Sequence, residues 1–398
     1  MAEKFIVIGI SDEGRPELSP EAYEAVCTHT VFSGGKRHLD AVRDILPKEY
    51  EWIEITVPLD GVFLKYGEYS GDIVVFASGD PLFFGFAATL LRRLPGTDIR
   101  VIPAFNSLQC LAHKAMLPYG GMRAVSLTGR PWHELDRALI EGSRMIGLLT
   151  DRTHTPGAVA SRLTEYGYTG YIAVVGERLG NRIYEKITEA PVEEMAGMDF
   201  AMPNCMILYG EVSGAPFGIP HTEFEGIPGR PEMITKMPVR LVTLAMLELP
   251  QKHCLWDVGF CTGSVSIEAR LRFPHLHVRA FEKCPERERL LEINSHRFRA
   301  PGIERHIGDI LSFDLRQFPA PDAVFIGGHG GRLEEIVRAI HPVLSPGGTM
   351  VFNSVSENSL RAFVRSTADC GMTLASNTVL RDGDHNPITI LKAVKHGK

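Results

Sequence analysis

Apolar residues in this sequence gather in short runs, and each run ends at a glycine or at polar residues. Runs of this length predict buried β-strands, and many of the segments between them have the spacing of an amphipathic helix. Alternation of strand and helix predicts an α/β protein. In the first half of the chain the predicted strands are residues 4–10, the run that begins at 71, and residues 99–102, 124–127, 145–149, 171–175 and 205–209.

The same alternation continues in the second half, where glycines again follow the apolar runs. The predicted strands there are 254–258, 277–281, 304–307, 322–326, 349–353 and a final pair, 378–380 and 388–394. This pattern predicts a doubly wound sheet. Glycine and proline are dense between residues 212 and 231, which is typical of a linker. We therefore predict two domains, residues 1–212 and 213–398.

Two helix starts carry residues of interest. Asp80 precedes Pro81 and a helical stretch over 85–94, so we expect its side chain to cap that helix. Thr235 is placed in the same way before a helical stretch that runs to about residue 249, and it is the expected cap there.

The stretch 255–268 indicates a cofactor site, because it combines a strand, a glycine turn and a helix start. Gly259 and Gly263 tolerate backbone angles that other residues resist, and Phe260, Cys261 and Thr262 lie between them. The turn places the N-terminus of a helix at the carboxyl end of a strand, where ligands of open α/β sheets bind. The alternative interpretation is a tight strand-to-helix turn with no ligand.

Two acidic residues favour the cofactor interpretation and narrow the ligand. Glu282 ends the next predicted strand, where such folds place a carboxylate that accepts the ribose hydroxyls. Asp309 and Ile310 follow the third predicted strand, from which an acid can reach an adenine amino group. The glycine run lacks the spacing that cradles a second phosphate, so adenosylmethionine is a better candidate than a dinucleotide.

A second site is expected in the first half. Several of its predicted strands end in polar loops that contain glycine or arginine, at 78–80, 128–130, 150–156 and 176–180. Loops that follow parallel strands meet at one edge of a sheet. This half therefore has its own predicted pocket.

Composition and charge exclude several other classes of protein. The 398 residues are 44% hydrophobic and 23% charged, with a net charge of −6, so no overall basic balance favours nucleic acid or an anionic membrane. We find no signal peptide and no long apolar run, and we expect a cytoplasmic protein without a membrane partner. The seven scattered cysteines are expected to be reduced, and we predict no metal site.

Several motifs together resemble a known family. In the first half they are Gly-Gly-Lys-Arg-His-Leu (34–39), Ala-Ser-Gly-Asp-Pro-Leu-Phe-Phe-Gly (77–85), Leu-Thr-Asp-Arg-Thr-His-Thr-Pro (149–156) and Gly-Glu-Arg-Leu-Gly (176–180). In the second half they are Ile-Thr-Lys (234–236), the glycine stretch, and Asp-Ala-Val-Phe-Ile-Gly-Gly-His-Gly-Gly (322–331). Over nearly its whole length the chain resembles the bifunctional, decarboxylating precorrin methyltransferases of cobalamin biosynthesis.

The resemblance implies a fold and a function. It implies an N-terminal tetrapyrrole methylase fold, made of two α/β subdomains with a cleft, and a C-terminal Rossmann-like methyltransferase domain. The implied reaction is methylation of precorrin-6B, or its cobalt form, at carbons 5 and 15 with loss of the ring C acetate carboxyl group. Adenosylmethionine is the implied cofactor, with one site in each domain, and we expect a homo-oligomer.

Cofactor contacts follow from the family's motifs, position by position. The implied contacts are Gly79, Asp80, Phe83, Asn106, Ser107 and Thr150 in the first domain, and Thr235, Gly259, Phe260, Cys261, Thr262, Gly263, Glu282, Asp309 and Ile310 in the second. Two positions depart from the family pattern. The first loop, residues 9–14, lacks the usual glycine and proline character, and Cys261 stands where the turn normally has its middle glycine.

The tetrapyrrole carries many carboxylates, so basic side chains are expected around each pocket. The candidates are Arg37, His38, Arg130, Arg152, His154, Arg178 and His329. Three alternatives stay open: a regulator that binds adenosylmethionine or a tetrapyrrole without catalysis, a methylase of another tetrapyrrole, and a fusion with an RNA or protein methylase. The lack of a basic stripe argues against RNA.

Overall fold

The computed structural model describes residues 4–11, 16–211, 214–381 and 387–397. Its contacts divide the chain into two units. The first comprises residues up to 130 together with 144–161 and 170–210, and the second comprises 131–143, 162–169 and 211–398. The predicted domain boundary between residues 212 and 213 lies outside the described residues, and it stays a prediction.

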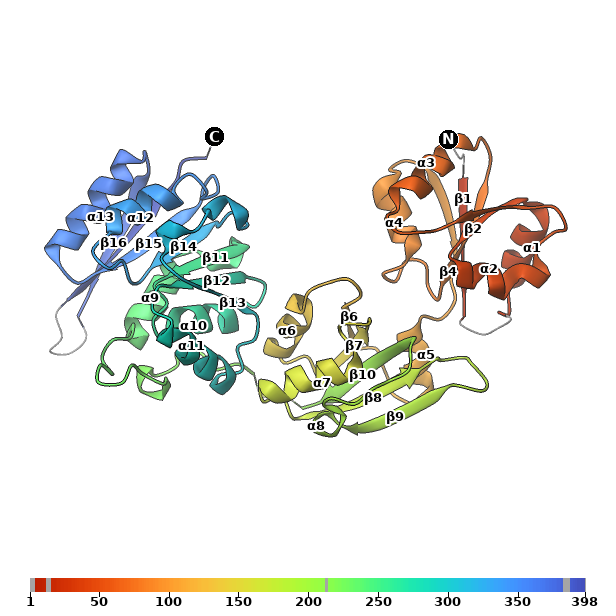
Figure 1. Cartoon of the computed structure of the whole chain (residues 1–398), viewed down its shortest axis with the longest axis horizontal. Coiled ribbons are helices and arrows are strands. Elements are labelled where there is room, and N and C mark those ends of the chain that lie inside the picture. The colour runs from red at the N-terminus through yellow and green to blue at the C-terminus, as the bar shows by residue number, and fades with distance from the viewer. Residues whose placement is uncertain (1–3, 12–15, 212–213, 382–386, 398) are drawn as a thin grey trace. The chain divides into compact units, whose positions relative to one another are not determined.

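The first unit begins with a parallel sheet in the order β3-β2-β4-β1-β5 (Figure 1). Its strands are β1 (Lys4–Ile10), β2 (Val31–Gly34), β3 (Glu51–Glu54), β4 (Ile73–Ser78) and β5 (Asp98–Ile102). Alternate residues of β1 face opposite layers: Phe5 and Val7 pack in one apolar cluster, and Ile6 and Ile8 in another. Burial on both faces explains why β1 reads as one continuous apolar run.

A second, mixed sheet completes this unit, in the order β6-β7-β10-β8-β9. Its strands are β6 (Arg123–Ser126), β7 (Met145–Leu149), β8 (Tyr171–Glu177), β9 (Lys186–Pro191) and β10 (Asn204–Gly210). Because β10 runs antiparallel to β7 and β8, its first residue lies at the same edge as the last residues of those two strands. The α-helices between residues 20 and 195 are α1 (Pro20–Thr28), α2 (Lys36–Val42), α3 (Asp60–Glu68), α4 (Phe86–Arg93), α5 (Ser107–Lys114), α6 (His133–Ile140), α7 (Pro156–Glu165) and α8 (Val192–Met195). Of these, α6 and the end of α7 belong to the second unit.

The second unit has a sheet in the order β13-β12-β11-β14-β15-β17-β16, parallel up to β15 and antiparallel beyond it. Its strands are β11 (Cys254–Val258), β12 (His277–Glu282), β13 (Ile303–Ile307), β14 (Ala323–Ile326), β15 (Thr349–Ser354), β16 (Thr373–Leu380) and β17 (Ile388–Val394). The order reverses at β11, which is the switch point at which doubly wound folds bind ligands. The α/β prediction is confirmed, with two sheets in the first unit and one doubly wound sheet in the second.

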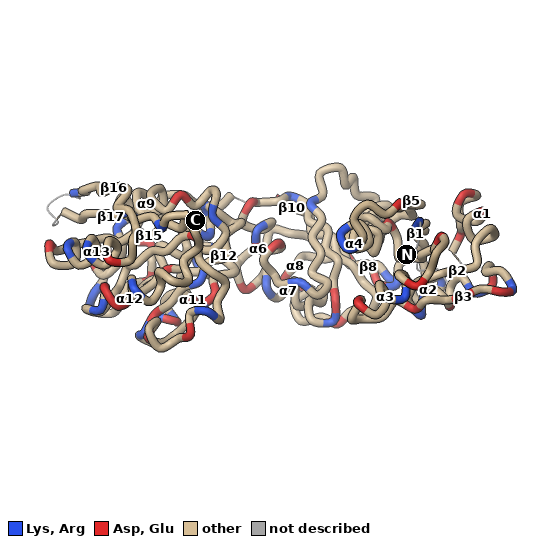
Figure 2. The backbone as a smooth tube through the Cα atoms, turned by 90° about the horizontal axis from the view of Figure 1, so that it is seen from above, with Lys and Arg blue, Asp and Glu red and all other residues tan. Residues whose placement is uncertain are grey.

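Helices cover both faces of this third sheet (Figure 1). They are α9 (Met237–Met246), α10 (Ser264–Arg272), α11 (Glu286–Arg297), α12 (Leu333–Ile340) and α13 (Glu357–Asp369). Trp256 of β11 packs in the cluster that contains residues of α12 and α13, and its neighbour Leu255 packs in the cluster that contains residues of α9 and α10. Acidic and basic positions are mixed along the outer helices (Figure 2).

Two predicted helix caps are wrong. Helix α4 begins at Phe86 with Gly85 at its N-cap, and the Asp80 carboxylate accepts instead from the Leu82 amide at 2.9 Å. Asp80 therefore stabilises a turn before the helix. Helix α9 begins at Met237 with Lys236 at its N-cap, so the helix starts beyond the reach of Thr235. In both cases a residue suited to capping lies in a loop that continues farther than the local pattern indicates.

Candidate cofactor and substrate sites

The first unit contains a cavity of about 650 Å³, the larger cavity. Its walls come from the carboxyl ends of β1 and β4 in one sheet, and from the ends of β7 and β8 and the start of β10 in the other. The expectation that polar loops of this half converge on one pocket agrees with this arrangement. Its lining includes seven of the residues identified from the sequence: Arg37, His38, Gly79, Phe83, Asn106, Ser107 and Thr150.

Gly79 is where two loops of the larger cavity touch. Its φ of +60° is in the left-handed region, and a Cβ built on it would lie 2.9 Å from the Asn106 Cα. Asn106 in turn caps α5, because its side chain accepts from the Gln109 amide at 2.9 Å. The close approach of the two backbones leaves room for glycine only at position 79.

Thr150 is held by the start of β10. Its hydroxyl lies 2.7 Å from the Asn204 carbonyl oxygen and 2.5 Å from the Asn204 side-chain oxygen. Asn204 lines the cavity beside it, although the sequence analysis did not identify Asn204. Its position opposite the end of β7 depends on the antiparallel pairing of β10, which carries no local sequence signal.

Five other predicted residues are not part of the cavity lining: Asp80, Arg130, Arg152, His154 and Arg178. Most of them have protein partners nearby. The Arg130 guanidinium lies 5.1 Å from the Phe84 ring centre, the His154 ring lies 3.2 Å from the Asp151 carboxylate, and Arg178 Nε donates to the Met202 carbonyl at 3.1 Å. The predicted cofactor contact of Asp80 and the predicted substrate contacts of the other four stay predictions.

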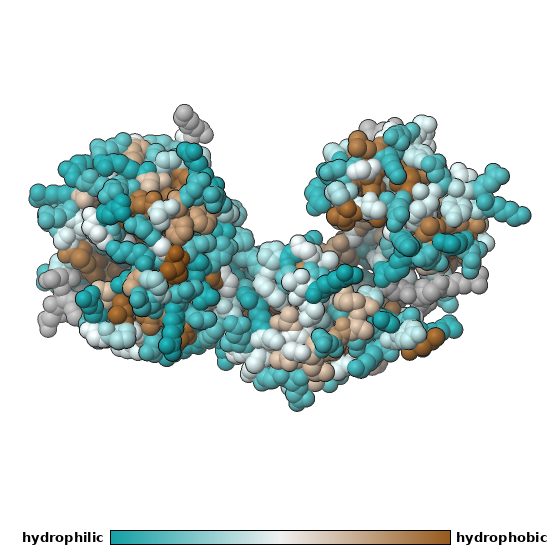
Figure 3. Space-filling view, viewed as in Figure 1, coloured by the Kyte–Doolittle hydropathy of each residue, from teal (hydrophilic) through white to brown (hydrophobic). Residues whose placement is uncertain are grey.

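Two exposed phenylalanines line the larger cavity and were missed by the sequence analysis. Phe84 is 42% exposed and Phe105 is 61% exposed. The φ of Phe84 is +53°, a left-handed value that is strained for a residue with a Cβ. In the space-filling view apolar residues of the first unit are exposed in separate patches among polar ones (Figure 3). Flat apolar surface at a cavity suits an aromatic or conjugated ligand.

The second unit contains a cavity of about 370 Å³, the smaller cavity, at the carboxyl ends of β11, β12, β13 and β14. The glycine turn forms one wall. Gly259 has a φ of +74°, and a Cβ built on it would lie 2.5 Å from the Gly328 nitrogen in the loop after β14. Cys261 has a φ of +56° and so adopts the left-handed conformation although it carries a Cβ.

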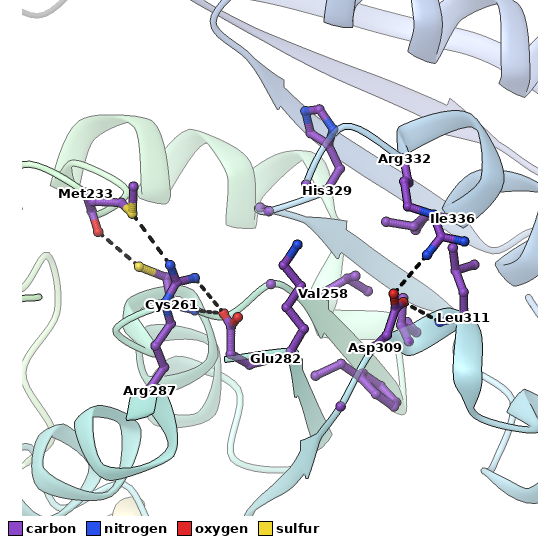
Figure 4. Close-up of a pocket in the computed structure, with 18 residues that line it drawn as sticks. Met233, Val258, Cys261, Glu282, Arg287, Asp309, Leu311, His329, Arg332 and Ile336 are labelled. Carbon is purple, nitrogen blue, oxygen red and sulfur yellow. Dashed lines mark hydrogen bonds and ion pairs between the residues drawn. The ribbon is translucent and has the colours of Figure 1, made fainter. Parts of the chain in front are cut away.

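Glu282 and Asp309 stand on opposite sides of this cavity (Figure 4). Glu282 is 3% exposed, accepts from the Cys261 amide at 3.1 Å, and pairs with Arg287 at 3.1 Å. The Asp309 carboxylate accepts from the Leu311 amide at 3.0 Å and pairs with Arg332 at 2.9 Å. Each of the two acids therefore has a guanidinium partner that the sequence analysis did not identify.

The smaller cavity gathers six residues identified from the sequence: Gly259, Cys261, Glu282, Asp309, Ile310 and His329. Four others are not part of its lining: Thr235, Phe260, Thr262 and Gly263. Phe260 is 4% exposed in an apolar cluster, and a Cβ on Gly263 would lie 2.2 Å from a Leu291 methyl group. The turn thus divides its residues between the cavity wall and the packing beneath it.

Lys283 and Arg332 add positive charge to the smaller cavity, and neither was predicted. Lys283 follows Glu282 directly, and a Cβ on Gly330 would lie 2.5 Å from its ammonium nitrogen, which places this cation beside the glycine-rich loop. Burial lowers the pKa of His329, so its ring is neutral near pH 7 and serves as a hydrogen-bonding group.

Asp257 lies in β11 just before the glycine turn and is fully buried, with a side-chain oxygen that has no hydrogen-bond partner in the described part of the chain. Burial raises its pKa to about 7, although the Ser266 amide and hydroxyl donate to the other oxygen. The folded protein therefore keeps a proton that the unfolded chain loses near pH 4, and the free energy of unfolding falls as pH rises from about 4 to about 7.

We expect Asp257→Asn to remove this dependence. Between about pH 4 and 7, titration of Asp257 should lower the free energy of unfolding of the wild type by up to about 1.4 kcal/mol per pH unit. The variant should lack this contribution. Urea unfolding of both proteins at a series of pH values measures the two slopes. Equal slopes would contradict the assignment of a raised pKa to Asp257.

The described residues contain no cluster of three or more His, Cys, Asp or Glu side chains placed to hold a metal ion. Within the same part of the chain, no helix has the length and apolar character that crossing a bilayer requires.

Both cavities are bordered by loop crossings that only glycine allows, and the smaller one also carries two carboxylates. Glycine at positions 79 and 259 lets two loops of each cavity approach to backbone contact, which a Cβ would prevent. The smaller cavity has a buried carboxylate at the end of β12 and a half-exposed one after β13, and acceptors at these two positions suit ribose and adenine.

Two family models match successive parts of the chain. Residues 4–196 match the family model of the tetrapyrrole (corrin/porphyrin) methylases, and residues 230–393 match that of the precorrin methyltransferase domain. A precorrin-6Y C(5,15)-methyltransferase [decarboxylating] from Sinorhizobium is 30% identical over 95% of this chain and 91% of its own length.

Two shorter relatives come from Salmonella typhimurium. A cobalt-precorrin-6B C(15)-methyltransferase (decarboxylating) is 35% identical over 41% of this chain and 89% of its own length. A cobalt-precorrin-7 C(5)-methyltransferase is 29% identical over 51% of this chain and 97% of its own length. Two separate enzymes are thus each similar to about half of this chain.

Proposed function

This chain belongs to the family of decarboxylating precorrin-6Y C(5,15)-methyltransferases, and from that premise we propose that its two cavities are two separate adenosylmethionine sites, one for each methylation. As in the family, the reaction is methylation of a precorrin with decarboxylation in cobalamin biosynthesis, with adenosylmethionine as methyl donor. The larger cavity serves carbon 5, and the smaller cavity serves carbon 15 and the decarboxylation.

The observation that carries this division is the pair of half-length relatives. The carbon-5 and carbon-15 enzymes of Salmonella typhimurium each align with about half of this chain, and each unit has a cavity at the ends of its strands. One chain that joins the two enzymes needs both sites. The predicted division at residues 212 and 213 lies between the two family matches, which end at 196 and begin at 230.

Bound adenosylmethionine supplies an electrophilic methyl group. The residues of this chain bind the cofactor and the substrate, orient them, and keep water away from the reacting atoms. In the smaller cavity we assign the ribose hydroxyls to Glu282 and the adenine amino group to Asp309. In the larger cavity we assign the cofactor to the crossing of Gly79 with Asn106, together with Thr150. Methyl transfer needs the nucleophilic carbon in line with the reacting bond more than it needs an acid or base.

Loss of carbon dioxide requires an electron sink, and the conjugated macrocycle itself can take the electron pair. The protein then has to hold the acetate carboxylate. Lys283 and Arg332 line the smaller cavity beside the neutral His329 ring, which places two cations and a hydrogen-bonding group there. We assign the substrate carboxylates of the carbon-15 step to these three residues.

Aromatic surface supports the tetrapyrrole in the larger cavity. Phe84 and Phe105 are exposed there, and a strained backbone at Phe84 presents its ring. We assign one face of the macrocycle to these rings.

The test is mass spectrometry of the tetrapyrrole after incubation of the pure protein with adenosylmethionine and precorrin-6B, with and without cobalt. We expect two added methyl groups and the loss of one carbon dioxide, and the two samples decide the metal preference. A protein that binds the cofactor but changes neither form would contradict the proposal. The homo-oligomer and the cytoplasmic location stay predictions, and light scattering of the pure protein measures the first.

Glu282→Gln should weaken cofactor binding in the second domain alone. A charge-assisted hydrogen bond contributes about 1.5–3 kcal/mol, so loss of the carboxylate should raise the dissociation constant roughly 10- to 100-fold. Methylation at carbon 15 should fall and methylation at carbon 5 should continue. Calorimetric titration with adenosylhomocysteine resolves the two sites.

Glu292→Gln is the matched control, because Glu292 lies on α11 of the same unit and pairs with Arg305 at 3.7 Å without lining the cavity. Its titration should match the wild type. If Glu282→Gln also binds two equivalents with wild-type affinity, the ribose assignment is wrong.

A further inference from the structure

Ser78 is the last residue of β4 and precedes Gly79 directly. Ser78 lines the larger cavity, and so do three residues near it, Gly35, Arg37 and His38. Ser78 is not among the residues predicted from the sequence to contact a ligand. The inference rests on the proposed function, because it names a ligand group of that same cavity.

The proton of the His38 ring can be located from its partners. The Gly35 amide donates to His38 Nδ1 at 3.2 Å, and a backbone N–H can only donate, so Nδ1 carries no proton. The ring proton is therefore on Nε2, which lies 2.9 Å from the Ser78 hydroxyl oxygen. His38 donates to Ser78. Burial, together with the charge of Arg37, lowers the pKa of His38 to about 4, in agreement with a neutral ring.

Arg37 is a second donor to the same oxygen. Its Nη2 lies 2.8 Å from Ser78 Oγ, and a guanidinium has no acceptor. A serine oxygen offers two lone pairs, and the two N–H groups occupy both. The hydroxyl proton of Ser78 must point to a third group, and no acceptor for it lies within hydrogen-bond distance in the described part of the chain.

This arrangement differs from that of a nucleophilic serine. A nucleophile donates its proton to the histidine, whereas Ser78 accepts from His38, whose other ring nitrogen is occupied by Gly35. Ser78 is therefore a donor prepared for a ligand, held by two residues from a segment about forty positions earlier in the chain.

We propose that the Ser78 hydroxyl, with the adjacent Arg37 guanidinium, binds a carboxylate in the larger cavity, and that His38 is a positioning residue that directs the hydroxyl. A donor beside a fixed cation favours an anionic acceptor. Two ligands of this cavity carry carboxylates: the tetrapyrrole and the methionine part of the cofactor. The chemistry is the same for both, and the experiment distinguishes them.

The test compares Ser78→Ala with the wild-type full chain for three ligands: precorrin-6B, adenosylhomocysteine, and 5′-methylthioadenosine, which lacks the carboxylate. We expect one carboxylate ligand to bind about 10- to 100-fold more weakly to the larger cavity. A loss of affinity for precorrin-6B assigns the carboxylate to the substrate. Loss for adenosylhomocysteine without loss for 5′-methylthioadenosine assigns it to the cofactor.

Thr28→Val is the matched control. Thr28 lies on α1 outside the lining of the larger cavity, and its hydroxyl donates to the Glu24 carbonyl at 2.8 Å, so its proton is already used within the protein. We expect less than about a twofold change for all three ligands. Ser78→Thr keeps a hydroxyl and should restore binding, and His38→Gln, which keeps an N–H, should bind better than His38→Leu.

Wild-type affinity of Ser78→Ala for all three ligands would overturn the proposal. An equal loss of affinity for adenosylhomocysteine and 5′-methylthioadenosine, with the affinity for precorrin-6B unchanged, would also overturn it. Such a result would mean that Ser78 contacts a part of the cofactor other than its carboxylate. If the wild type binds two equivalents of adenosylhomocysteine but no precorrin, the proposed function fails. The comparison of adenosylhomocysteine with 5′-methylthioadenosine still decides whether Ser78 binds the cofactor carboxylate.

Discussion

Gly259→Ala is expected to abolish methylation at carbon 15 while methylation at carbon 5 continues. The new methyl group would lie 2.5 Å from the Gly328 nitrogen and 2.6 Å from its Cα, so two backbone segments have to separate. Both segments line the smaller cavity. A displacement of about 1 Å at a reacting site costs on the order of 10²-fold in rate. Mass spectrometry of the product should find one methyl group fewer and no loss of carbon dioxide.

Gly331→Ala is the control that separates the effect of this clash from the effect of placing a Cβ on left-handed backbone. Gly331 has a φ of +83°, close to the +74° of Gly259, but a Cβ built on Gly331 would have no atom of the described residues within 4 Å beyond its chain neighbours. It should cost about 1–2 kcal/mol of stability and leave turnover at both carbons within a few-fold of the wild type. If the two variants lose carbon-15 methylation equally, the crossing of the two loops does not control the site.

Glu268→Ala is expected to destabilise the second domain by about 3–5 kcal/mol, the largest stability effect among the substitutions proposed for this chain. Glu268 and Arg240 form a buried ion pair at 2.9 Å, with side chains 1% and 0% exposed. Glu268 also accepts from the amides of Gly218 and Ile219, at 2.6 and 3.3 Å. Burial already lowers the pKa of Arg240, and removal of Glu268 leaves that charge without its counterion.

Urea unfolding of the full chain measures this effect as a lower free energy of unfolding for the second unit. Glu357→Gln is the matched control, because Glu357 pairs with Arg361 at 3.0 Å on the surface, with side chains 67% and 75% exposed. It should change the free energy of unfolding by less than about 0.5 kcal/mol. A similar small change for Glu268→Ala would mean that the buried pair does not hold residues 218 and 219 to the second domain.

Much of the fold was predictable because its signals are local. A strand buried on both faces needs an apolar side chain at nearly every position, and the runs at β1, β11 and β14 have this composition. The carboxylates of the smaller cavity were predictable for a related reason. Glu282 and Asp309 follow successive strands, and parallel strands bring their ends to one edge.

Helix caps were less predictable, since several residues near a helix start are chemically suited to the role. Asp80 and Thr235 are good caps by type, but the helices begin at Phe86 and Met237. The loop conformation before a helix depends on what it packs against, and the capping pattern alone does not contain that information.

The sequence by itself determined the alternation of strand and helix, the glycine turn at 259–263 and the acids after the next two strands, because each depends on residue type and short-range spacing. Only the tertiary structure decided which groups meet: Gly259 against Gly328, Arg332 with Asp309, and Arg37 and His38 on Ser78. These contacts join residues that are distant in the chain. Strand order, register and loop crossings fix them, and no local period encodes those three.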